Sequence, residues 1–207
     1  MRYTDVVFDI DGTLIDSTRA IRAGLDDLAL ELVGRRLTPQ EAALGNGLPA
    51  GPALERMGLP GDEGTQERWI RNLLAHWDEV VVFDGVPEVL ARLARSGVRL
   101  GAVTAETRSE MERGFATFDV SRLLAHVVVA EDTERHKPDP EPLESYLAWS
   151  GAEAGDVLYV GDGLVDAECA QAAGVDFALA AWRPRPLRRG VGEVARLEEP
   201  RQVLELI

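Results

Sequence analysis

Two aspartates, Asp9 and Asp11, stand one residue apart at the end of a short apolar run. That run, residues 6–8, contains two valines and a phenylalanine and predicts a strand buried on both faces of a parallel sheet. Gly12 follows and lets the backbone turn sharply. Because ligands of open α/β sheets bind outside the carboxyl ends of the strands, the two carboxylates are well placed for chemistry. A solvated polar turn is the structural alternative, since Asp and Gly are common in turns.

Asp162 repeats this pattern farther along the chain, after the apolar residues 157–160. Asp9, Asp11 and Asp162 are expected at neighbouring strand ends, where three carboxylates form a credible site for a hard cation such as Mg2+. Capping of the next helix is the structural alternative for Asp162. With an ordinary pKa of about 4, Asp9 is expected to be ionised at neutral pH and to need no base to act as a nucleophile.

Two further positions offer donors to an anionic substrate. Thr104 ends the apolar run 98–103, and its hydroxyl and the next backbone N–H can donate to a phosphate oxygen. Lys137 lies in the sequence K-P-D-P, whose prolines stiffen the loop and fix the direction of the ammonium group. A turn threonine and a solvated surface lysine are the structural alternatives.

The sequence D-I-D-G-T-L-I-D, residues 9–16, resembles the nucleophile motif of the haloacid dehalogenase (HAD) superfamily, D-x-D-G-T-[LV]-x-D. Thr104 matches the second motif of that superfamily, and Lys137 in K-P-D-P resembles the third. The sequence G-D-G-L-V-D, which contains Asp162 and Asp166, resembles the fourth. The four motifs fall in the family's order, each at a predicted strand end or in the expected loop. Most members of the superfamily are phosphatases.

The resemblance implies a division of roles in the metal and proton chemistry. Asp9 is the expected nucleophile, and its side chain is expected to ligate Mg2+ together with that of Asp162. Asp11 is the expected ligand through its backbone carbonyl and also the expected general acid and base. Partial burial and neighbouring carboxylates are expected to raise the pKa of Asp11, so that it can donate a proton. Asp166 is expected to support these ligands from behind them.

Substrate binding falls, by the same resemblance, to Thr104, Ala105 and Lys137. Lys137 is also an expected catalytic residue, since its charge offsets the charges of the phosphate and of Asp9. Ala105 and Glu106 depart from the usual second motif, because many helical-cap phosphatases carry Asn after the Thr. One polar contact is lost there and one negative charge is added, which leaves the substrate open but not the reaction.

The elements that position these residues alternate between strand and helix after residue 83. Strands are predicted at 98–103, 126–130, 157–160 and 175–180, and helices at 87–96, 109–118, 142–149 and 164–173. With the first strand, this alternation predicts an α/β fold built on a Rossmann-like doubly wound parallel sheet. A surface loop and a short final helix near residues 202–207 are expected to complete the chain.

Residues 17–82 have a helical pattern and separate the first strand from the second. Ser17 or Thr18 is predicted to cap the first of these helices. The insertion resembles the small α-helical cap domain of the C1 subgroup of the superfamily, so residues 1–16 and 83–207 are the expected core domain. Such a cap closes over the site and selects substrates.

The composition limits the classes of partner. The 207 residues carry a formal net charge of −14, which repels nucleic acid and anionic membranes, so neither is an expected partner. A phosphate ester is also an anion, so the site must supply local positive charge. No apolar run approaches the roughly 20 residues of a membrane span, and a single cysteine, Cys169, fits a reduced, cytoplasmic setting. Four arginines, none preferred over the others, are candidates for receiving an anionic substrate: Arg19, Arg22, Arg56 and Arg108.

A Mg2+-dependent phosphatase of small phosphomonoesters is the leading functional prediction, through an aspartyl-phosphate intermediate and most like the phosphoglycolate phosphatase branch. Its partner is then a small phosphorylated metabolite, bound by a monomer or homodimer. A phosphomutase similar to β-phosphoglucomutase shares the core and is the main alternative. A non-catalytic binding protein is disfavoured because all core catalytic positions are present. A dehalogenase is disfavoured because that branch lacks the second aspartate, present here as Asp11.

Overall fold

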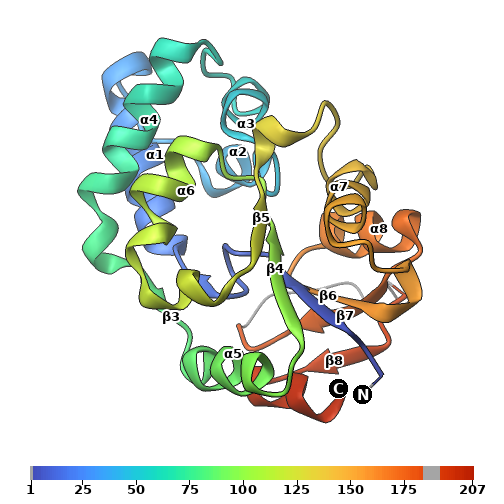
Figure 1. Ribbon diagram of the computed structural model, residues 1–207. Helices are drawn as coiled ribbons and strands as arrows, with labels where there is room; N and C mark the ends of the chain where they lie inside the picture. The colour runs from blue at the N-terminus through green and yellow to red at the C-terminus, as the bar shows by residue number, and fades with distance from the viewer. Residues whose placement is uncertain (1, 184–191) are drawn as a thin grey trace.

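The computed structural model describes residues 2–183 and 192–207, which form a parallel six-stranded sheet with helices on both faces (Figure 1). The strand order is β5 (His126–Val128), β4 (Arg99–Val103), β1 (Asp5–Phe8), β6 (Val157–Gly161), β7 (Asp176–Ala180) and β8 (Ala195–Leu197). Neighbouring strands in this order are parallel throughout. β1 therefore lies between β4 and β6, and Asp9 follows it at the carboxyl edge of the sheet.

The side chains of β1 alternate between two apolar cores, as the pleat of a strand requires. Val6 and Phe8 belong to one core and Val7 to the other, and all three are buried. α5 (Val86–Arg95) covers the first face, while α7 (Glu141–Ser150) and α8 (Leu164–Ala173) cover the second (Figure 1). The predicted α/β Rossmann-like sheet is confirmed.

Four helices lie between the first and second strands of the sheet in the chain: α1 (Thr18–Val33), α2 (Pro39–Ala43), α3 (Ala50–Arg56) and α4 (Glu63–Ala75). Figure 1 shows them gathered to one side of the sheet, next to α6 (Arg108–Arg113). The chain enters and leaves this group through a two-stranded antiparallel sheet of β2 (Ile15–Asp16) and β3 (Val81–Val82). None of the described helices combines the length and apolarity needed to cross a membrane.

Short 3-10 helices join several of these elements: η1 (Trp77–Glu79), η2 (Phe115–Thr117), η3 (Asp119–Leu123), η4 (Ala130–Asp132), η5 (Ala154–Asp156) and η6 (Pro200–Glu205). The helix predicted at 109–118 is divided, because it ends as α6 at Arg113 and resumes as η2. Gly114 separates the two parts, and the Trp77 ring packs so closely there that a Cβ would lie 2.7 Å from it. The predicted final helix is η6, a 3-10 helix that begins two residues early.

The end of the chain also differs from prediction through β8, which was not foreseen. This strand has three residues, one of them Arg196, so it lacks the apolar run that marks the other strands. The backbone N–H of Ala181 donates to Leu197 and extends the pairing with β7. The predicted surface loop falls largely on residues 184–191, which lie outside the described residues.

Ser17 stands at the predicted capping position of α1, but its side chain makes no capping hydrogen bond. Its hydroxyl donates to the Asp11 carboxylate instead. Thr18 is the first residue of α1 and not its cap. The sequence signal for a cap therefore marked a residue whose hydroxyl serves the strand-end turn.

Candidate active site

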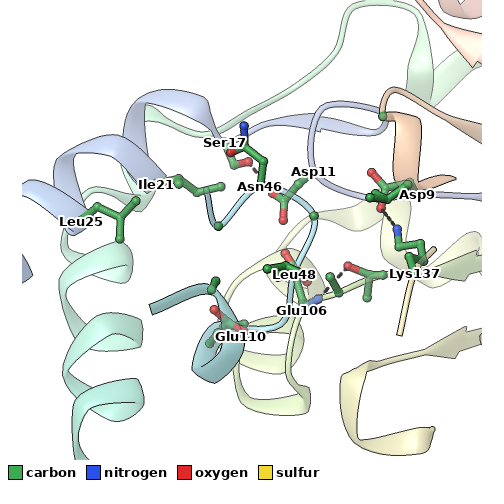
Figure 2. Close-up of a pocket in the computed structure, with 18 of the residues that line it drawn as sticks. Asp9, Asp11, Ser17, Ile21, Leu25, Asn46, Leu48, Glu106, Glu110 and Lys137 are labelled. Carbon is green, nitrogen blue, oxygen red and sulfur yellow. Dashed lines mark hydrogen bonds and ion pairs between the residues drawn. The ribbon is translucent and has the colours of Figure 1, made fainter. Parts of the chain in front are cut away.

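Lys137 is buried at the carboxyl edge of the sheet, with a side chain 4% exposed. Its ammonium nitrogen lies 2.7 Å from Asp9 Oδ1 and 2.8 Å from Asp166 Oδ1. Figure 2 shows the lysine directed at Asp9. The Lys137 ammonium also donates to the Tyr159 hydroxyl oxygen at 3.2 Å. The reading of Lys137 as a surface residue is therefore wrong, because three buried polar groups hold its charge inside the protein.

Tyr159 is a site residue that the sequence analysis missed. Its hydroxyl donates to Asp166 Oδ1 at 2.9 Å, and the Gly163 backbone N–H donates to Asp166 Oδ2, also at 2.9 Å. Both oxygens of Asp166 therefore have partners within the protein. A phenol in the otherwise apolar run 157–160 was the available signal, since a buried Tyr hydroxyl usually requires a hydrogen-bond partner.

Asp9, Asp162 and Asp166 form a buried acidic cluster, in which one oxygen from each lies within 4.8 Å of the others. The turn at Gly12 brings the backbone against this cluster. Gly12 has φ +86°, and a Cβ there would lie 2.1 Å from Asp162 Oδ2. Glycine is thus required on two counts. Of the three acids predicted to meet at the strand ends, Asp9 and Asp162 belong to this cluster and the Asp11 side chain does not, whereas Asp166 joins them.

Burial raises the pKa of Asp9 well above its ordinary value, and the nearby Asp166 and Asp162 add to this rise against the opposing charge of Lys137. The expectation of an ordinary Asp9 pKa is therefore wrong. The Lys137 ammonium contacts two of the three carboxylates in this cluster, those of Asp9 and Asp166. A cation among the three would favour the ionised form of Asp9.

Asp11 points away from this cluster and lies beside Ser17 and Glu106 (Figure 2). Burial raises the pKa of Asp11, while hydrogen bonds with Ser17 and Glu106 oppose the rise. The predicted direction is confirmed, although burial is the cause and the neighbouring Glu106 acts as a hydrogen-bond partner. A carboxyl with a raised pKa retains a proton to higher pH, as a general acid must.

The second motif lies at the end of β4, where Thr104, Ala105 and Glu106 line the same cavity as Asp9. The Glu106 backbone N–H donates to Thr104 Oγ1 at 3.1 Å. The Glu106 side chain is buried, and its Oε2 has no hydrogen-bond partner among the described residues. Burial raises the pKa of Glu106 well above its ordinary value, and Asp11 and Glu110 raise it further.

The cavity has a volume of about 390 Å3 and lies between the sheet edge and the inserted helices. The helices and their loops contribute mostly apolar side chains, among them Leu25, Leu48 and Trp69, with Asn46 beside them. Gly47 of the same loop approaches the core so closely that a Cβ would lie 2.7 Å from Val165 Cγ2. The inserted segment therefore forms one wall of the cavity.

A second cavity of about 270 Å3 adjoins the first at Asp11 and is lined by Arg22 and Arg183. Arg22 donates to the Leu37 carbonyl and pairs with Asp26 at 2.8 Å. The other arginines considered as anion receptors do not line either cavity: Arg19 and Arg56 are exposed, and Arg108 pairs with Asp132.

Comparison with known proteins places the chain in a family. The sequence model of the haloacid dehalogenase-like hydrolases matches residues 6–180. Among curated relatives, a phosphoglycolate phosphatase of Cereibacter sphaeroides is 32% identical over 84% of this chain and 83% of its own. A pyrophosphatase PpaX of Bacillus cereus is 31% identical over 88% of this chain and 85% of its own. A protein of Lactobacillus plantarum whose crystal structure is known is 30% identical in sequence to this chain, and the two structures match over 100% of each chain with a TM-score of 0.87. The chain belongs to the haloacid dehalogenase-like hydrolase family, as its four motifs predicted.

Proposed function

We propose that the chain is a Mg2+-dependent phosphatase, which hydrolyses small phosphomonoesters through an aspartyl-phosphate at Asp9. One observation carries the proposal: Asp9 lies in the wall of a cavity, in contact with a buried lysine and within 4.8 Å of two further carboxylates. The names of the two curated relatives, a phosphoglycolate phosphatase and a pyrophosphatase, support the same class of reaction.

The donor set fits Mg2+, because this cation prefers oxygen ligands and the cluster offers three carboxylates whose oxygens lie within 4.8 Å of one another. Asp9 and Asp162 are the proposed side-chain ligands, and Asp11 contributes its backbone carbonyl. Asp166 supports them, since its two oxygens are engaged by Lys137, Tyr159 and Gly163. When bound, the metal supplies positive charge that lets an anionic carboxylate and an anionic phosphate approach one another.

The proposed reaction then uses groups of the chain itself. A carboxylate oxygen of Asp9 attacks phosphorus, and Lys137, the Thr104 hydroxyl and the Ala105 backbone N–H bind the phosphoryl oxygens. Asp11 gives its proton to the departing oxygen. It then takes a proton from the water that hydrolyses the acyl phosphate.

The inserted segment, residues 17–82, is proposed to act as a cap on the core of residues 1–16 and 83–207. Its apolar side chains line the cavity opposite Asp9, where they can exclude bulk water from the phosphoryl group. A phosphomutase has the same core requirements and is the second candidate. It differs in returning the phosphoryl group to a sugar, whereas a phosphatase releases inorganic phosphate.

The test is phosphate release from p-nitrophenyl phosphate, with Mg2+ and with a chelator. We expect activity with Mg2+ alone, a loss beyond detection in Asp9→Asn, and wild-type activity in the exposed control Asp119→Asn. Intact-protein mass spectrometry after rapid quench is expected to find a phosphate-sized mass increase in the wild type. Full activity in chelator or in Asp9→Asn would contradict the mechanism. In a parallel assay with a sugar phosphate, isomerisation of that substrate without net release of phosphate would favour the phosphomutase.

A further inference from the structure

Away from Asp9 and Lys137, where the phosphoryl group is proposed to bind, the described residues that line the cavity include acids but no cation. Of the described residues that line it, Lys137 is the one cation, and its ammonium is shared between Asp9 and Asp166. The part of the wall facing the inserted helices contains two more acids, Glu106 and Glu110. The alcohol portion of a substrate would therefore meet carboxyl groups and apolar side chains.

The two acids of this wall differ in their partners. Glu110 accepts hydrogen bonds from the Trp69 indole at 2.8 Å and from the backbone N–H and hydroxyl of Thr107, each at 2.8 Å. Glu106 is 9% exposed, and its Oε2 has no partner among the described residues. An unpaired buried oxygen of this kind is costly unless a ligand donates to it. Glu106 is thus the acid with an oxygen left for a ligand.

The nearest described arginines do not line the wall beside Glu106. Arg22 and Arg183 line the adjoining cavity beyond Asp11 and not the one that contains Glu106. Each already has an acidic neighbour, Asp26 at 2.8 Å for Arg22 and Asp16 at 3.7 Å for Arg183. A small anionic end group beside Glu106 would find no described cation there to receive it.

We propose that Glu106 selects the alcohol portion of the substrate, favouring esters that end in a hydroxyl or ammonium donor over esters that end in a carboxylate or a second phosphate. The donor would occupy Glu106 Oε2, whose lone pairs would repel the oxygens of a carboxylate or second phosphate placed at the same point. This inference rests on the proposed function, and it departs from the substrates in the names of the two relatives, both of which are anionic beyond the reacting phosphate.

The test compares four two-carbon phosphate esters that differ in one end group: 2-hydroxyethyl phosphate, phosphoethanolamine, ethyl phosphate and 2-phosphoglycolate. We expect kcat/KM for the first two to exceed that for phosphoglycolate by at least about tenfold, with ethyl phosphate between them. In Glu106→Gln this ratio is expected to shrink severalfold, because the amide keeps the shape of the side chain but can turn an N–H toward the ligand in place of the acceptor oxygen Oε2.

Two controls keep the outcomes separable. Glu112→Gln removes one charge from an exposed position on α6 and is expected to leave the ratio unchanged. Affinities of the four esters for Asp9→Asn, measured by calorimetry with Mg2+, give the same ranking without turnover. Failure of the proposed function would appear as no hydrolysis of p-nitrophenyl phosphate, and the affinities would still test Glu106. Equal values for all four esters, a preference for phosphoglycolate, or an unchanged ratio in Glu106→Gln would overturn the inference.

Discussion

Strand β1 begins at a buried aspartate, Asp5, and is followed directly by another, Asp9, and the two have opposite surroundings. Asp5 is 0% exposed and Asp9 6% exposed. Asp5 accepts hydrogen bonds from the Arg99 guanidinium, from the Tyr146 hydroxyl at 3.0 Å and from the Thr4 hydroxyl at 2.7 Å. Asp9 shares the ammonium of one lysine with another carboxylate. Among the described residues, Asp5 thus has three donor side chains of its own, whereas the one cation paired with Asp9 also pairs with Asp166.

The pKa values of the two carboxyls follow this difference. Burial favours a higher pKa for Asp5, but hydrogen bonds from Arg99, Thr4 and Tyr146 outweigh it, and the pKa lies below its ordinary value. The pKa of Asp9 lies well above its ordinary value. The same residue type on the same strand is therefore structural where its partners are complete. It is available for chemistry where a ligand must complete them.

Asp11→Asn should have the largest effect, and it tests the Asp9 end by separating two half-reactions. Asparagine keeps the size of the side chain and the backbone carbonyl but transfers no proton. We expect activity on alkyl phosphates to fall by roughly 100- to 10,000-fold. An aryl phosphate, with a good leaving group, is expected to give a burst of phenol and then slow turnover.

Rapid-quench mass spectrometry of that variant is expected to find the phosphorylated protein accumulating. Equal losses on aryl and alkyl esters with no phosphoenzyme would contradict the role of Asp11. That outcome would instead indicate that Asp11→Asn disturbs the backbone turn at Gly12.

Lys137→Ala should have the next effect, because it removes the buried cation from the Asp9 end. We expect turnover to fall by at least ~100-fold, a usual scale for loss of one key electrostatic group. Arg135→Ala is the matched control, since it removes an exposed cation two residues away that pairs with Asp139 and Glu141. Near-normal kinetics in Lys137→Ala, measured by steady-state phosphate release, would remove the lysine from the mechanism.

Asp5→Asn should lower the stability of the protein and leave its activity nearly unchanged, in contrast to the two variants at the Asp9 end. We expect the free energy of unfolding to fall by about 1.5–3 kcal/mol, because the hydrogen bonds to a charged Asp5 are weakened. Turnover is expected to stay within about twofold of wild type, since Asp5 lies at the far end of β1. Urea denaturation gives the first quantity and phosphate release the second. A large loss of activity without a loss of stability would erase the contrast between the two ends.

The pH dependence sharpens this contrast. The pKa of Asp5 is lower in the folded than in the unfolded chain, so its stabilisation is present above the unfolded value of about 3.9. It is lost as the pH falls through the folded value. The difference in unfolding free energy between wild type and Asp5→Asn should therefore narrow below about pH 4. A difference that widens on acidification would contradict the assignment.

The sequence predicted most of the fold because the buried strands are continuous apolar runs. The helix predicted at 164–173 has the same bounds in the structure, and the strand predicted at 157–160 is one residue longer. β8 was missed because three residues, one an arginine, carry no such pattern. Local periodicity does not report which strands lie side by side.

The same limit applies to the site. Strand-end acids could be placed from the sequence because all parallel strands end at one edge of the sheet. Asp5 was not singled out, because its pairing with Arg99 depends on β1 lying beside β4 in this register. Tyr159 was missed and Glu106 was taken only as an added charge, since their partners come from distant segments.

The burial of Lys137 has a practical consequence, because it is the single lysine of the chain. Incorporation of 15N-lysine would give one ε-ammonium resonance, held between Asp9 and Asp166 and shielded from solvent. That resonance would report directly on the phosphate pocket without interference from any other side chain of its type.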